Sequence, residues 1–102
     1  MFPYQKVRQG SKIVLYAAGK VGKAFFHQLQ KTRYCELSAW VDKKETIYKG
    51  QVIVAPENAV WKDTDYSVIA IEDETIAKKI KRELVVKYNV TSDRLIWVNP
   101  II

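Results

Sequence analysis

With 102 residues, of which 48% are hydrophobic and 27% charged, the sequence has the composition of one ordinary globular domain, and not of a disordered or fibrous chain. No apolar run approaches the roughly 18 to 20 residues that a membrane span needs, and the first eleven residues lack the apolar core of a signal peptide. The single cysteine, Cys35, suits a reducing compartment. We therefore expect a cytoplasmic chain without membrane insertion.

The formal net charge of +6 raises nucleic-acid binding as a possibility. The basic residues are scattered, however, and those in the C-terminal third alternate with apolar residues at helical spacing, as on the wet face of a helix: Lys78, Lys79, Lys81, Arg82 and Lys87. The sequence therefore predicts no nucleic-acid partner.

Short apolar runs alternate with amphipathic stretches along the whole chain. In chain order, we expect strands at 12–17, 37–41, 52–54, 66–71 and 94–98. Between them we expect a helix from the glycines to about Lys31, a polar loop at 43–50, a brief helix at about 56–60 and a long helix at 72–88. In that last helix Ile76, Ile80, Leu84 and Tyr88 have the spacing of a core face.

Apolar strands that alternate with helices predict a parallel sheet covered on both faces. Right-handed crossovers leave few topologies. We expect one α/β domain over residues 1–102, with five parallel strands in the order 3-2-1-4-5. The order reverses between the first and fourth strands, where such sheets bind ligands.

The turn after the first strand carries the most informative pattern, Ala17-Ala18-Gly19-Lys20-Val21-Gly22. Gly19 would let a pyrophosphate approach the backbone, Gly22 would let the helix pack closely on the strand, and the helix N-terminus would face the phosphates. Lys20 adds positive charge. Twenty residues past Gly22, at the end of the second strand, Asp42 is placed to accept hydrogen bonds from a ribose.

Three details of this pattern qualify the prediction. Ala17 stands where the fingerprint has its first glycine, and alanine makes the turn without strain only if its φ is negative. Lys43, directly after Asp42, can pair with a 2′-phosphate, but the fixed acid favours NAD over NADP. Glu72, Asp73 and Glu74 are expected to cap the long helix. In the alternative interpretation the glycines serve packing alone and Asp42 is a solvated acid.

No catalytic or metal-binding set is predicted. His27 falls on the solvent face of the first helix, and Cys35 precedes the second strand with no base partner. Trp40, Trp61 and Trp97 are expected in the core or at an interface.

Four segments together resemble a known family: KIVLYAAGKVGKAFF at 12–26, AWVDK at 39–43, Ala55-Pro56-Glu57, and YSVIAI at 66–71. They are similar to the small Rossmann-like domains of bacterial surface-polysaccharide enzymes. These domains occur in capsule glycosyltransferases and related methyltransferases, and in sugar-nucleotide dehydratases and acyltransferases. The resemblance implies NAD or a nucleotide-sugar over Gly19 and Gly22, with Asp42 as its ribose or base reader. It also implies that the chain is one domain of a longer polypeptide.

Two hypotheses of different classes follow. The first is a nucleotide-binding accessory or regulatory domain of a polysaccharide-synthesis protein, such as a glycosyltransferase. The second is a structural module for dimerisation or docking that binds no small molecule.

Overall fold

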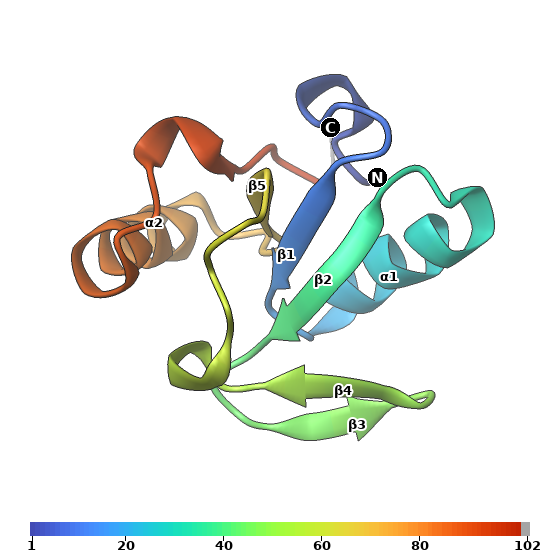
Figure 1. Cartoon of the computed structure of the whole chain (residues 1–102), viewed down its shortest axis with the longest axis horizontal. Helices are drawn as coiled ribbons and strands as arrows, with labels where there is room; N and C mark the ends of the chain where they lie inside the picture. Colours follow the sequence, from blue (N-terminus) through green and yellow to red (C-terminus); the bar gives the residue numbers. More distant parts are fainter. Residues whose placement is uncertain (101–102) are drawn as a thin grey trace.

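A six-stranded, mostly parallel sheet organises the chain, with one long helix against each of its faces (Figure 1). The computed structural model describes residues 1–100, so residues 101 and 102 of the predicted domain lie outside it. The strands are β1 (Lys12–Tyr16), β2 (Glu36–Val41), β3 (Thr46–Tyr48), β4 (Gln51–Val54), β5 (Tyr66–Ile69) and β6 (Leu95–Ile96). The helices are α1 (Lys20–Thr32) and α2 (Glu74–Tyr88), with single 3₁₀ turns η1 (Tyr4–Lys6), η2 (Pro56–Asn58) and η3 (Ser92–Arg94).

The strand order is β3-β4-β2-β1-β5-β6, so the predicted count of five strands and the predicted order are wrong as they stand. The five predicted strands are parallel and keep the predicted neighbours. The addition is β3, which pairs antiparallel with β4 at the edge of the sheet. The last strand, predicted at 94–98, is also shorter: η3 occupies residues up to Arg94, and β6 has only two residues.

The added strand lies in the segment 43–50 that was expected to be a polar loop. Lys49 and Gly50, the two residues between β3 and β4, both have positive φ, at +48° and +81°. A two-residue turn with both φ values positive matches the right-handed twist of paired strands and closes a hairpin. The turn therefore converts the expected loop into an edge hairpin.

The two faces of the sheet bury separate cores, as alternating side chains of β1 show. Ile13 and Leu15 face α1, whereas Val14 and Tyr16 face α2. On the α1 side, Phe25, Phe26 and Leu29 pack onto the sheet with Trp40. On the α2 side, the helix contributes Ala77, Ile80 and Leu84. The predicted helices on both faces are confirmed.

The prediction that Ile76 belongs to the core face of α2 is wrong. Ile76 is 46% exposed and lines a cavity beside the sheet, whereas its neighbour Ala77 is buried in the core. Within residues 1–100, no helix combines the length and the apolar character needed to cross a membrane.

Candidate functional site

The candidate site is the edge of the sheet where β1 and β5 end side by side. Tyr16 and Ile69 are paired in register as the last residues of these two strands. The chain leaves β1 toward α1 on one face and β5 toward α2 on the other, so the two connecting loops diverge. Figure 1 shows this divergence at the centre of the sheet. The predicted reversal of strand order is found here.

The β1–α1 turn is held in a strained conformation at Ala17, whose φ is +93°. Ala17 therefore lacks the negative φ with which alanine makes this turn without strain. Hydrogen bonds on both sides of the residue maintain the conformation: its N–H donates to the Val41 oxygen at 2.7 Å, and its carbonyl accepts from the Trp40 indole Nε1 at 2.8 Å. A non-glycine residue at positive φ costs on the order of 1 kcal/mol or more, and these bonds offset that cost.

Gly22 allows α1 to approach this turn closely. A Cβ added to Gly22 would lie 2.1 Å from the Ala17 carbonyl oxygen and 2.9 Å from its carbon. No side chain fits there without backbone movement. The packing role predicted for Gly22 is confirmed.

Gly19, in contrast, borders open space. It is the N-cap residue of α1 with a φ of −80°, and a Cβ added to it meets no atom within 4 Å. The first backbone N–H of the helix with an acceptor is that of Lys23, which donates to the Gly19 oxygen. Within residues 1–100 the N–H groups of Lys20, Val21 and Gly22 have no acceptor. Lys20 and Val21 line the open space beside Gly19, so their N–H groups are available to an anion, whereas Gly22 is buried against the turn.

Asp42 is closely associated with the turn. Its Oδ2 accepts a hydrogen bond from the Ala18 N–H at 2.7 Å, and its Oδ1 accepts one from the Lys44 N–H at 3.2 Å. The side chain is half-buried. Because each carboxylate oxygen can accept more than one hydrogen bond, Asp42 stabilises the turn and still has acceptor capacity.

The loop after β5 is fixed in a similar way. The Trp97 indole Nε1 donates to the Ile71 oxygen at 2.7 Å. Two residues on, the Asp73 carboxylate accepts from the Ile76 N–H at 3.1 Å and caps α2, as predicted for this acidic segment. A tryptophan indole thus holds a backbone carbonyl in each of the two loops that border the crevice.

Two adjoining cavities occupy the crevice. The first, which we name the turn cavity, has a volume of about 410 Å³ and is lined by Ala17, Gly19, Lys20 and Val21 and, across from them, by 70–73. The second, the Tyr16 cavity, has a volume of about 480 Å³. Its lining is Tyr16, Ala17, Asp42 and Lys43 with the apolar side chains Ile71, Ile76 and Ile80 and, at the rim, Lys79 and Glu83.

The structure thus brings most of the predicted site residues together. Ala17 and Ile71 line both cavities. Of the eight predicted site residues, only Ala18 and Gly22 line neither cavity, and both have contacts within the turn itself.

Sequence reasoning did not identify the roles of Trp40, Trp97 and Tyr16. The two tryptophans were expected as core or interface residues, and nothing in their spacing indicates which carbonyl an indole will reach. Tyr16 occupies an ordinary position in an apolar strand. Only the three-dimensional arrangement shows that it lines a cavity.

Two reactive side chains lie outside the crevice. His27 is exposed, as predicted, and its Nε2 lies 2.8 Å from the Tyr48 hydroxyl. Cys35 is buried, and burial raises the pKa of its thiol to about 11, so the unreactive protonated form dominates at neutral pH.

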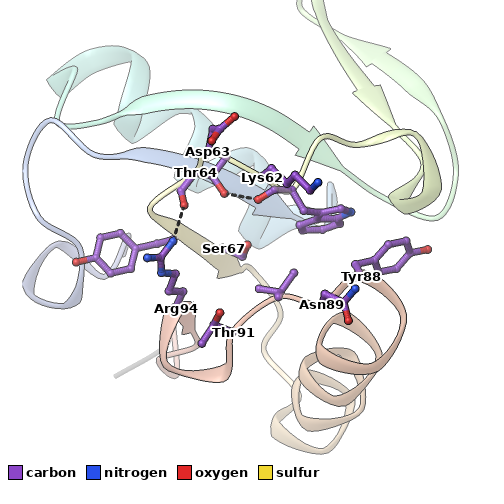
Figure 2. Close-up of a pocket in the computed structure, with 11 residues that line it drawn as sticks. Lys62, Asp63, Thr64, Ser67, Tyr88, Asn89, Thr91 and Arg94 are labelled. Atoms are coloured by element: carbon purple, nitrogen blue, oxygen red, sulfur yellow. Dashed lines mark hydrogen bonds between the residues drawn. The ribbon is translucent and has the colours of Figure 1, made fainter.

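A separate cavity of about 230 Å³ opens at the other end of β5, between that strand and the end of α2. Figure 2 shows the buried Ser67 at its base, and Arg94 reaching the Thr64 carbonyl oxygen at 3.4 Å. Lys62 and Asp63 lie above it with opposite charges. None of the predicted site residues lines it.

No family model, curated protein or solved structure matches this chain. The resemblance to polysaccharide-synthesis domains therefore stays a prediction.

Proposed function

We propose that this chain is a Rossmann-like domain that binds a nucleotide in the crevice between β1 and β5. The observation that carries the proposal is the open N-terminus of α1. Gly19 has free space above it, and three successive N–H groups without acceptors follow it. The helix adds roughly half a unit of positive charge at this end. A pyrophosphate, which NAD and nucleotide-sugars share, has the charge and size for this position.

The Tyr16 cavity supports a nucleoside as the remainder of the ligand. Its volume of about 480 Å³ falls in the range of small-molecule sites, roughly 300 to 1,000 Å³. The isoleucines Ile71, Ile76 and Ile80 suit the faces of a base, and Asp42 at the edge suits a ribose hydroxyl. The exposure of Ile76 is consistent with this role, because a bound base would cover it.

Charge around the turn cavity sets a limit on the ligand. Lys20 lines the cavity, but Glu72 and Asp73 line its opposite side. Lys23, the other basic residue of the turn, lies 5.0 Å from the centre of the Tyr48 ring, away from the lining. Phosphates are therefore favoured directly over Gly19 and disfavoured near α2. This arrangement suits one diphosphate.

The wider biological role rests on the sequence resemblance alone. We propose that the domain is an accessory or regulatory part of a polysaccharide-synthesis protein, with NAD or a nucleotide-sugar as its ligand, within a longer polypeptide.

The hairpin supports a second candidate function, a dimerisation or docking module. Ile47 and Val52 face each other across β3 and β4 and are 68% and 55% exposed. Since β3 is the edge strand, its free backbone groups and these side chains could pair with another chain. Sedimentation of the isolated chain with and without nucleotides would distinguish the two candidates. A dimer that binds none of the nucleotides tested supports the dimerisation or docking module.

The test of nucleotide binding is calorimetric titration with NAD, NADP, UDP-glucose, ADP and UDP. The matched variants are Gly19→Val, which places a side chain in the free space of the turn cavity, and Ala24→Val, which adds the same branched side chain to an exposed position of α1. We expect at least one ligand to bind wild type and Ala24→Val equally, and Gly19→Val to lose that binding while staying folded. Binding that survives in Gly19→Val, or no binding by wild type at millimolar ligand, would contradict the proposal.

A further inference from the structure

The hydroxyl group of Tyr16 has no hydrogen-bond partner within residues 1–100, although it is buried. The residue as a whole is only 3% exposed. Most buried polar side-chain atoms in proteins are hydrogen-bonded, and leaving one unpaired costs about 1 to 3 kcal/mol. An unpaired hydroxyl beside a cavity therefore calls for an explanation.

Tyr16 lies on the face of the sheet that α2 covers. The connection from β4 to β5 contains only the short η2 turn, so α2 is the one α-helix on this face within residues 1–100. Tyr16 extends from the central strand β1 onto this surface and lines the cavity there, beside Ile71 and Ile80.

The surroundings of the hydroxyl determine what it can bind. Burial, with the nearby charges of Glu83 and Asp42, raises the pKa of Tyr16 to about 12. The phenol thus remains protonated at neutral pH and is available as a donor. The cavity lining holds Lys43 and Lys79 as well as these two carboxylates, so its formal charges cancel and the neutral phenol is matched by an uncharged acceptor.

We infer that the Tyr16 hydroxyl donates a hydrogen bond to a carbonyl oxygen or ring nitrogen of the ligand's base, which makes Tyr16 a specificity-determining residue. The inference rests on the proposed nucleotide binding. The hydroxyl is buried in the structure, so the base reaches it only when side chains that line the cavity move. Of the two charged α2 side chains in that lining, Lys79 is exposed, whereas Glu83 is 30% exposed and pairs with Lys87 at 3.7 Å.

The test compares Tyr16→Phe, which removes only the hydroxyl, with Tyr66→Phe, a matched loss of a hydroxyl outside the Tyr16 cavity. Titrations use ADP, GDP, CDP and UDP. We expect Tyr16→Phe to bind the best of the four about 3- to 10-fold more weakly than wild type, the value of one hydrogen bond. The affinity differences among the four bases should also shrink. Tyr66→Phe should bind as wild type does.

A second measurement separates recognition from a structural role. Without nucleotide, Tyr16→Phe should melt at the same temperature as wild type or higher, because an unpaired buried hydroxyl is removed. Unchanged affinities in Tyr16→Phe, or a large drop in its melting temperature, would overturn the inference while leaving nucleotide binding intact. Failure of wild type to bind any of the four nucleotides would instead overturn the proposed function, and this inference with it.

Discussion

Replacing Gly22 with alanine tests the architecture of the β1–α1 turn, because the new methyl group would overlap backbone that cannot easily move. The added Cβ would lie 2.1 Å from the Ala17 carbonyl oxygen, well inside the 3.4 Å at which ordinary contact begins. That oxygen accepts the Trp40 indole hydrogen bond at 2.8 Å. To relieve the overlap, α1 must move away or the carbonyl must rotate, and rotation would leave a buried indole N–H unpaired.

The cost of Gly22→Ala follows from these two effects. Overpacking typically costs about 1 to 3 kcal/mol, and an unpaired buried donor a further 1 to 3 kcal/mol, so we expect a loss of roughly 2 to 6 kcal/mol. Domains of this size are stabilised by about 5 to 15 kcal/mol in total. The variant should therefore be much less stable than wild type, with a melting temperature lower by roughly 8 °C or more.

The assay is denaturant unfolding followed by tryptophan fluorescence and circular dichroism, with Gly19→Ala as the matched control. Gly19 borders open space at negative φ, so its methyl group meets nothing. Alanine is a poorer N-cap residue than glycine, which lowers stability, but it also makes the unfolded chain less flexible, which raises stability. These effects nearly cancel, and we expect the free energy of unfolding to change by no more than about 1 kcal/mol. If Gly22→Ala were as stable as Gly19→Ala, the account of this turn would be refuted.

Three further results are expected. Ala17→Gly removes the strain of the positive φ but also removes a buried methyl group, so its unfolding free energy should stay within about 1 kcal/mol of wild type. Titrations should show that the variant binds dinucleotides more tightly than wild type does. Weaker binding would contradict the idea that the Ala17 methyl group obstructs the ligand. Asp42→Ala leaves the Ala18 N–H unpaired, so its free energy of unfolding should fall by about 1 to 3 kcal/mol. The same change should weaken NAD binding more than NADP binding. Asp42→Asn, which keeps an acceptor, should be more stable than Asp42→Ala in the same unfolding assay. Folding favours the protonated Tyr16 phenol, whose pKa is raised from 10.0 to about 12, so the free energy of unfolding should be at its full value below pH 10 and fall as the pH rises through 12. This fall should be smaller in Tyr16→Phe than in Tyr66→Phe. Equal falls in the two variants would refute the assignment to Tyr16.

Much of the fold could be predicted because burial leaves a direct pattern in the sequence. Runs such as that of β1 are apolar on both faces, which only a covered strand requires, and the spacing of Ile80 and Leu84 identifies the packed side of α2. The hairpin was missed because β3 has only three residues and is largely exposed, so no apolar run marks it. The turn at Lys49 and Gly50 was its one local signal.

The site was predictable only as far as local sequence determines it. The position of Gly19 at the start of α1 and that of Asp42 at the end of β2 follow from strand and helix order. The positive φ of Ala17 does not, because it depends on the hydrogen bond from Trp40, which is distant in sequence, as well as on the space left by the nearby Gly22. The unpaired Tyr16 hydroxyl likewise depends on which side chains of β1 and α2 meet after folding.

The most direct test of nucleotide binding is an NMR titration of the ¹⁵N-labelled chain with NAD and with UDP-glucose. The account predicts saturable shifts concentrated in the amides of Lys20, Val21 and Gly22, which have no acceptor within residues 1–100, with a second group around Asp42 and Ile71. Shifts confined to the cavity around Ser67 and Arg94, or no saturable shift at millimolar ligand, would contradict it.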